Sequence, residues 1–258
     1  FVLPEVYANP TGAKVVSGQA TFATQGNTLN ITNTPGAVIH WQGFSINANE
    51  TTKFIQQSAQ SSVLNRVVTA DPSVILGTLQ SNGKVFLINP AGILVGQGAK
   101  LDVGAFVGST LNITNADFLA GKHNFQNTPG AKDVINQGSI ATPVGGYVYL
   151  VGTNVKNEGI IKTPQGETIL AAGNSVQLID SATPGVRVEV NASNNKAENL
   201  GTIIADSGRV GIVGAIVRNK GGIAADQVSR GADGRIFLKA TKSVAIEQGS
   251  KISANGER

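Results

Sequence analysis

The chain contains no cysteine and no methionine, and the first of these absences excludes two structural devices. Neither a disulfide nor a zinc site built on thiolates is possible. A chain without cysteine also suits passage through an oxidising periplasm, because no cross-link can lock it into a folded shape on the way. The chain begins at Phe1 rather than at an initiator methionine, so we expect a processed piece truncated from a longer polypeptide.

Long apolar runs are missing as well. The longest, such as Val85–Ile88, have the length of a strand and fall far short of the ~20 residues that cross a bilayer. We therefore expect no membrane insertion. No charged leader followed by an apolar core is present, so we expect that any export signal has already been removed.

Charge is sparse and evenly spread. Only 14% of the residues are charged and the formal net charge is +4. The basic residues occur singly, without the runs of about five or six that bind nucleic acid, so we expect a solvated surface and no nucleic-acid partner. Mild positive charge would still help the protein settle on an anionic host or bacterial cell surface. The two histidines, His40 and His123, stand alone, so we expect no metal and no cofactor.

The residues that are abundant predict an all-β chain. Aromatic residues make up only 5% of the chain, whereas 32 of its 258 residues are glycine. Glycine together with many Asn, Thr, Val and Ile residues favours short strands joined by tight corners. Burial then rests on stacked aliphatic side chains, each contributing ~1.5–3 kcal/mol when fully buried. The length suits one elongated domain, so we interpret residues 1–258 as a single domain.

The second half of the chain repeats itself with a fixed period. The phrase Asn-x-Gly-x-Ile begins at Asn136, Asn157, Asn199 and Asn219. The spacings are 21, 42 and 20 residues, and we interpret the middle one as two periods. A period of about 20 residues built from strand and turn residues predicts a parallel β-helix, in which each coil buries its apolar side against its neighbours.

A second phrase keeps step with the first. Four glycines open runs of β-forming residues, and each run is followed by a valine; the pairs are Gly146 with Val155, Gly166 with Val176, Gly208 with Val217 and Gly234 with Val244. Two phrases with one period support the same prediction of about 20–21 residues per coil.

The N-terminal part follows a different pattern. Residues 1–49 alternate as strands separated by turn signals such as Pro35-Gly36, which is typical of hairpins. The open end of a parallel stack needs a cover, so we assign these residues as an N-terminal β cap and residues 50–258 as the β-helix. Residues 50–68 are interpreted as strand and loop, and regular coils are expected from Gly77. Breaks in the phrase near 116–132 and 180–197 predict excursions outside the stack, the second of them a hairpin.

Several runs resemble the N-terminal secretion domain of two-partner secretion exoproteins, the family of filamentous haemagglutinin and the high-molecular-weight adhesins. These runs are Val63–Val67, Ile75–Leu79, Asn82–Ile93 and Val107–Leu111, and the resemblance covers essentially the whole chain. The most specific element is Leu87-Ile-Asn-Pro-Ala-Gly-Ile93, where Ala91 stands in place of the Asn of the family pattern Asn-Pro-Asn-Gly-Ile. The family's Asn-Pro-Asn-Leu motif does not occur, and Asn65-Arg66-Val67 lies in the comparable region.

The resemblance implies a right-handed single-stranded parallel β-helix with capping strands. It also implies a partner, a cognate outer-membrane transporter of the TpsB type that engages the segment in the periplasm while it is unfolded or partly folded. Once secreted to the cell surface, the segment would nucleate folding of the downstream repeats of the same exoprotein. A one-dimensional stack is compatible with this role, since a starting coil lets each later coil add by nearest-neighbour contacts.

The resemblance implies six candidate residues for transporter recognition, and each has a structural alternative. They are Asn65, Arg66, Asn89, Pro90, Ala91 and Gly92. Proline fixes one backbone angle and glycine tolerates positive φ, so the Asn89–Gly92 run also predicts a turn. Arg66 either contacts the transporter or pairs with a surface carboxylate such as Asp71. The four repeat asparagines are expected to be stacked corner residues that bond the backbone of adjacent coils, not ligands.

A polysaccharide-degrading enzyme is the first alternative function, because parallel β-helices carry such enzymes with carboxylates clustered on one face. Asp206 and Asp226 are 20 residues apart and could lie on adjacent coils, with Arg209 and Arg230 nearby. No third acid falls in step, so we expect no catalytic residue and no enzyme.

A carbohydrate-binding adhesin module is the second alternative. Sugar-binding surfaces use exposed aromatic rings, and Tyr147 and Tyr149 lie on the same side of one predicted strand. The chain has only three Tyr and one Trp, and Trp41 is expected to pack in the cap.

Overall fold

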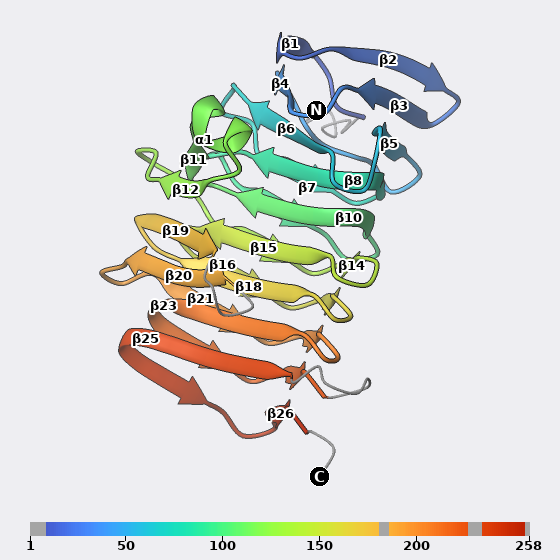
Figure 1. Ribbon diagram of the computed structural model, residues 1–258. Coiled ribbons are helices and arrows are strands. Elements are labelled where there is room, and N and C mark those ends of the chain that lie inside the picture. The colour runs from blue at the N-terminus through green and yellow to red at the C-terminus, as the bar shows by residue number, and fades with distance from the viewer. Residues whose placement is uncertain (1–8, 181–185, 227–233, 256–258) are drawn as a thin grey trace, which may run out of the picture.

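The computed structural model describes residues 9–180, 186–226 and 234–255. The chain winds into coils stacked along one axis, with the first described strands at one end of the stack and the last at the other (Figure 1). Corresponding strands of successive coils pair in parallel, as β15 (Tyr147–Gly152) does with β18 (Glu167–Ala172). The fold is a right-handed parallel β-helix, which confirms the class predicted from the repeat.

Each full coil contributes strands to three faces, called A, B and C in chain order. Face A consists of β3 (Thr28–Asn33), β5 (Thr51–Ile55), the first parts of β8 (Thr78–Ile88) and β10 (Lys100–Ser109), β14 (Ser139–Ala141), β17 (Ile160–Lys162), β22 (Thr202–Ile204), β24 (Gly222–Ala224) and β26 (Lys251–Ser253). Face B consists of β4 (Ala37–Trp41), β6 (Ser62–Val67), the second parts of β8 and β10, β15, β18 and the first parts of β23 (Arg209–Asn219) and β25 (Arg235–Ile246). Face C consists of β7 (Ser73–Ile75), β9 (Ile93–Val95), β13 (Val134–Asn136), β16 (Val155–Asn157), β21 (Lys196–Asn199) and the second parts of β23 and β25.

Aliphatic side chains from all three faces fill the interior. Inward positions of face B repeat along the stack as Val85 and Leu87 in one coil and Val148 and Leu150 in a later one, all fully buried. Aromatic rings contribute mainly near the first coils, where Trp41, Phe44 and Phe54 are buried. Stacked aliphatic burial is therefore the main source of stability, at ~25 cal/mol per Å² of apolar surface.

The antiparallel cap is shorter than the predicted segment 1–49. It consists of β1 (Lys14–Ser17), which pairs antiparallel with β4, and β2 (Ala20–Gln25), which pairs antiparallel with β3. β3 and β4 themselves pair in parallel with β5 and β6, so the first coil begins at Thr28, well before residue 50 or Gly77. The pairing direction of a strand depends on its neighbour, and the alternating pattern of residues 28–42 is the same for both directions.

The two excursions meet in one antiparallel sheet outside the stack, seen at the left of Figure 1. Its strands are β11 (Asn112–Ile113), β12 (His123–Gln126), β19 (Ser175–Asp180) and β20 (Val186–Asn191), with the short helix α1 (Asn115–Leu119) between the first two. β12 of the first excursion pairs with β19 of the second. The inner side of this sheet packs on the outer side of face B and forms a second apolar cluster that includes Phe86, Ile88 and Phe125.

The 42-residue spacing between Asn157 and Asn199 is one coil and not two. Asn157 pairs directly with Asn199 in register, and the extra residues form the β19–β20 hairpin. Val176 lies in that hairpin, so its predicted equivalence with Val155 is wrong, and Ala197 occupies the equivalent place. The inserted hairpin has nearly the length of one coil and the same alternation of strand residues, so spacing alone could not separate the two.

Glycines of the repeat stand where adjacent coils approach most closely. A Cβ placed on Gly159 would lie 2.1 Å from the carbonyl oxygen of Gly138, and one on Gly201 would lie 2.1 Å from that of Gly159. Any side chain at these corners would push two coils apart. The Gly of Asn-x-Gly is therefore a packing requirement of the stack.

Candidate functional site

The two motifs that the family resemblance pointed to lie side by side on face B. Asn65 and Arg66 lie near the end of β6, and Leu87 and Ile88 of β8 pair with them in register in the next coil. Asn89 follows Ile88 directly. The motifs are about one coil apart in sequence, so coiling brings them together.

A turn joins β8 to β9 at Asn89–Gly92. The Gly92 N–H donates to the Asn89 carbonyl at 3.1 Å, and the Asn89 Oδ1 accepts from the Ala91 N–H at 3.0 Å. Gly92 has φ of 122°, a left-handed backbone that a side chain would strain. The fully buried Asn89 initiates the turn, while Pro90 and Ala91 are partly exposed.

The side-chain nitrogen of Asn89 also makes hydrogen bonds within the protein. The Nδ2 donates to the Asp71 carbonyl and to the Ser73 Oγ, both at 2.9 Å. Its side chain therefore fastens the turn to the segment that leads into β7. In the folded domain nothing of Asn89 remains available to a partner.

Asn65 is likewise part of the interior. It is 0% exposed, its Oδ1 accepts from the Trp41 Nε1–H at 2.9 Å, and its Nδ2 donates to the Phe86 carbonyl at 3.2 Å. Trp41 packs edge-to-face against Phe22 and Phe44, so the expected packing role of this ring near the cap holds. Asn65 supplies the acceptor that a buried indole N–H requires.

Arg66 connects face B to the first excursion. Its guanidinium donates to the Asn112 Oδ1 at 3.2 Å, to the Asn115 Oδ1 at 2.8 Å and to the Ile113 carbonyl at 2.5 Å. The alternative ion pair with Asp71 is not among the interactions of the described residues, where the Asp71 carboxylate lies near the Thr69 hydroxyl. Arg66 is thus a fastener between the stack and the β11–α1 segment.

His40 completes the arrangement around Arg66. Its Nε2 lies 3.1 Å from the Arg66 Nη1. Burial is the main cause that lowers the pKa of His40, and the charges of Arg66 and Lys14 lower it further. Burial also lowers the pKa of Arg66. The neutral imidazole is therefore favoured, and in that form an unprotonated Nε2 accepts a hydrogen bond from the guanidinium.

The four repeat asparagines form a buried ladder along face C. The Nδ2 of Asn136 donates to the Oδ1 of Asn157 at 2.7 Å, and the same bond links Asn157 to Asn199 and Asn199 to Asn219 at 2.8 Å each. All four are 0% exposed. Their main bonds run between side chains of adjacent coils, with weaker bonds to corner carbonyls such as that of Gly221. The ladder holds coils in register and leaves no group free for a ligand.

The acids considered for catalysis have structural partners. Asp226 accepts from the Asn255 N–H and the Ser253 Oγ, both at 2.8 Å, and the Asn255 bond, followed by the Ser253 bond, lowers the pKa of Asp226. Arg209 bonds Glu167 at 2.8 Å instead of Asp206. Arg230 lies outside the described residues. In the part of the chain that the structure describes, no three His, Cys, Asp or Glu side chains gather into a group that could hold a metal.

The two tyrosines considered for sugar binding stack on each other, with ring centroids 4.5 Å apart. Tyr149 is buried beneath the excursion sheet, and its hydroxyl donates to Glu167 at 2.8 Å. His123 of β12 packs edge-on against both rings. These rings pack the excursion sheet against face B, and the buried ring of Tyr149 is not accessible to a sugar.

Sequence reasoning missed the residues that surround Arg66. Asn112 and Asn115 are 46 and 49 residues away in sequence, too far for any local pattern to connect them. The helix that carries Asn115 did have a signal, because Thr114 caps it by accepting from the Asp117 N–H at 3.0 Å, and Thr-x-x-Asp is typical of a helix start. As to membranes, the described residues include no helix that is long and apolar enough to cross one.

One family model and one solved structure agree with this architecture. The family model described as the TPS secretion domain matches residues 6–254. The crystal structure of the HMW1 secretion domain from Haemophilus influenzae superposes with a TM-score of 0.90 at 38% identity, covering 96% of this chain and 67% of that one. That of the filamentous hemagglutinin secretion domain gives a TM-score of 0.49 at 15% identity, covering 94% and 100%.

A curated relative extends the comparison to a full-length protein. The heme/hemopexin-binding protein of Haemophilus influenzae strain Rd is 32% identical over 205 residues, which is 76% of this chain. The chain spans only 23% of the length of that relative.

Proposed function

This chain belongs to the TPS secretion domain family, whose members are non-enzymatic parts of secreted exoproteins, and from that premise we propose how it is exported. A cognate outer-membrane transporter of the TpsB type binds the chain in the periplasm before it folds, after its signal peptide has been removed. The domain then folds outside the cell and starts the β-helix of a large adhesin-like or haemagglutinin-like exoprotein.

The burial of the motif residues is the observation that carries this proposal. Asn65, Asn89 and Gly92 are buried in the folded domain, and both amides already have internal partners. A transporter that reads these side chains has to do so while the chain is extended, when backbone and side chains are free for strand addition. Once folding has buried these side chains, the transporter can no longer bind them. In this proposal the chain therefore leaves the transporter as it folds.

The one-dimensional stack gives the export a direction. Each coil contacts only its neighbours, so coils that have formed outside the pore provide the surface for the next. The capped first coils, with β3 and β4 already paired to β5 and β6, supply that starting surface. Downstream repeats of the same exoprotein are the second partner in this proposal.

The only tryptophan of the chain offers a direct test. Trp41 donates to Asn65, so its fluorescence reports the burial of one motif as the domain folds. We expect the isolated periplasmic domains of the transporter to bind the chain just diluted from urea, and binding capacity to decay with the rate constant of the Trp41 signal. Equal binding by the fully folded domain would contradict the proposal.

Two substitutions separate recognition from folding. Ser73→Ala removes a partner of Asn89 without altering either motif, so it should slow folding and leave binding of the unfolded chain unchanged. Asn89→Ala should weaken binding of the unfolded chain and also impair folding, whereas Ala91→Ser, at a partly exposed turn position that uses only its backbone N–H, is the control for folding and should leave folding unchanged. If secretion persists undiminished after Asn65-Arg66 and Asn89–Gly92 are both scrambled, these residues do not recognise the transporter.

The proposal is confined to export and the start of folding. Heme or hemopexin binding belongs, by its printed name, to a relative of which this chain spans 23%. Whether the parent exoprotein adheres to host or bacterial cells is a property of the longer protein, and co-expression with its downstream repeats is the experiment that addresses it.

A further inference from the structure

The excursion sheet, made of β11, β12, β19 and β20, joins coils that are not adjacent in the stack (Figure 1). β11, α1 and β12 follow β10 in the chain, and β19 and β20 follow β18, so the coil that carries β15 lies between the two excursions. β12 nevertheless pairs antiparallel with β19, over residues 123–126 and 175–178. Contacts within a stack reach only from one coil to the next, whereas this pairing skips a coil.

The inner side of the excursion sheet covers face B from the first coils to β23. Every face-B strand from β4 to β23 contributes buried apolar side chains to the cluster beneath the sheet, whereas β25, among the described residues, contributes only the partly buried Phe237. From the excursions the cluster receives Ile113, Phe118, Phe125, Val176, Leu178 and Val188. Both excursions therefore bury one continuous apolar surface, and the burial that each achieves depends on the other.

Single side chains also connect separate coils beneath the sheet. The ring of His123 in β12 stacks on Phe86 of β8 with centroids 5.6 Å apart, and it meets Tyr149 of β15 edge-on at 6.0 Å. β10 lies between these two strands, so one ring bridges coils that do not touch. The Tyr149 hydroxyl donates to Glu167, which accepts from Arg209 on its other oxygen, and this chain of bonds extends from β15 to β23.

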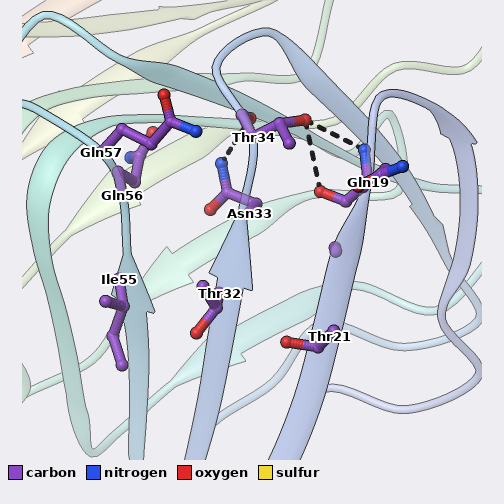
Figure 2. A pocket seen from close by; sticks show the side chains of 9 residues that line it. Gln19, Thr21, Thr32, Asn33, Thr34, Ile55, Gln56 and Gln57 are labelled. Atoms are coloured by element: carbon purple, nitrogen blue, oxygen red, sulfur yellow. Dashed lines mark hydrogen bonds between the residues drawn. The ribbon is translucent and has the colours of Figure 1, made fainter.

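At the cap end, strand pairing alone holds the first two coils together less completely. β3 and β5 pair only as far as Thr32 and Ile55. Beyond that pair the strands part around a polar hollow at the corner between faces A and B (Figure 2). Pairing resumes at the Gly36 N–H, which donates to the Ser62 carbonyl at 2.9 Å. Face B, which the excursion sheet covers, therefore contributes a larger share of the contact between these coils.

We propose that the excursion sheet is a strap that makes the coils from β4 to β23 one cooperative folding unit. In a stack with neighbour contacts alone, coils can open one after another from an end. Here the apolar surface of the first coils is fully covered only when β12 has β19 beside it, so coils at both ends of the strap become stable together. The last coil, with β25 and β26, lies outside the strap and opens by itself.

The strap has a consequence for export, and this consequence rests on the proposed function. β20 ends at Asn191, so the starting surface for later coils is complete only after the chain has emerged to that residue. The strap itself is a property of the folded domain and is tested without a transporter.

Native-state hydrogen exchange of the folded domain at low urea concentrations, measured by mass spectrometry, tests the strap. We expect β6 and β21, in coils at opposite ends of the strap, to exchange through one opening with equal protection and equal urea dependence. β26 should exchange at least about tenfold faster. Leu178→Asp puts a charge into the buried cluster and should detach the strap, so that β6 and β21 no longer share one protection. Gln177→Asp, on the exposed side of the same strand, is the matched control and should keep them equal.

A cross-link provides a second test that does not destabilise the domain. Asn124 and Gln177 are opposite each other in the β12–β19 pairing, and the chain has no cysteine of its own, so Asn124→Cys with Gln177→Cys allows one disulfide. In the oxidised form, exchange in β6 and in β21 should slow by the same factor, at least about tenfold. The reduced form should exchange like the unmodified domain.

The outcomes separate a strap from a stack with neighbour contacts alone. Unequal protection of β6 and β21 in the unmodified domain, or equal protection in a folded Leu178→Asp variant, would overturn the proposal. If Leu178→Asp does not fold, the disulfide decides, because slowing confined to the excursion sheet and the coils between β10 and β18 would overturn it too. Exchange of β26 together with β6 would overturn the stated end of the unit. Each of these failures leaves the transporter proposal standing, since that proposal is tested by binding of the unfolded chain.

Discussion

Removing one rung of the asparagine ladder is the sharpest test of how the coils are held together. Asn157 is 0% exposed, accepts from Asn136 at 2.7 Å and donates to Asn199 at 2.8 Å. Asn157→Ala would leave the Nδ2 of Asn136 without its acceptor and the Oδ1 of Asn199 without its donor. Both groups would stay buried between coils, where water cannot replace the lost partner.

The magnitude follows from those two orphaned groups. Each buried polar group without a partner costs ~1–3 kcal/mol, so the variant should lose about 2–6 kcal/mol of unfolding free energy. A typical domain has ~5–15 kcal/mol in total, so this is a large share. Each coil contacts only its neighbours, so the loss of stability is concentrated at the two interfaces between coils that Asn157 joins.

Urea denaturation followed by far-UV circular dichroism measures the loss. With an m-value near 3 kcal/mol/M, a loss of 3 kcal/mol moves the midpoint by about 1 M. The matched control is Asn154→Ala, because Asn154 also bridges coils, to Asp133 and to the Lys196 N–H, but at the surface. Its loss should be about 1 kcal/mol or less, since water replaces the bonds. A midpoint for Asn157→Ala no lower than that for Asn154→Ala would refute the reasoning.

Three further predictions concern the corner glycines, the contacts of Arg66 and the pH dependence of stability. Gly159→Ala should cost about 2–4 kcal/mol or prevent folding, because its Cβ would lie 2.1 Å from a carbonyl oxygen, whereas Gly222→Ala, with nothing closer than 3.9 Å, should be near neutral in the same urea assay. Arg66→Lys should speed hydrogen exchange in β11 and α1 by loss of the forked contacts, and Arg187→Lys, in an exposed ion pair, should not. The lowered pKa of His40 means that its contribution to stability is present above pH 6.5 and is lost as pH falls through the folded pKa. His40→Asn should therefore flatten the fall in urea midpoint between about pH 7 and 5, and an unchanged slope would contradict this coupling.

The repeat could be predicted from sequence wherever a corner demanded a particular residue. Asn157 and Gly159 recur because the ladder and the close approach of coils admit few alternatives, so their spacing gave the coil length directly. The spacing misled only at Asn199, where a hairpin of about one coil's length was inserted. A period counts residues along the chain and contains no information on whether they stay in the stack.

The candidate site could be located from sequence, but its contacts could not. The resemblance pointed to Asn65-Arg66 and Asn89–Gly92, and coiling brings them together. Their partners lie elsewhere: Trp41 for Asn65, and residues of the excursion for Arg66. Polar residues in an alternating strand give no sign of whether they face water or a buried donor.

The burial of both motifs has a consequence for which substitutions can change export alone. A residue that the transporter binds and that folding then buries has two roles. Its replacement weakens transporter binding before export and lowers the stability of the folded domain after export. Pro90 and Ala91 are different, because they remain partly exposed and Ala91 uses only its backbone N–H in the turn. Under the proposed recognition, a substitution at position 91 would therefore change transporter binding at little cost to folding, whereas Asn89 is held by five backbone and side-chain hydrogen bonds within the protein.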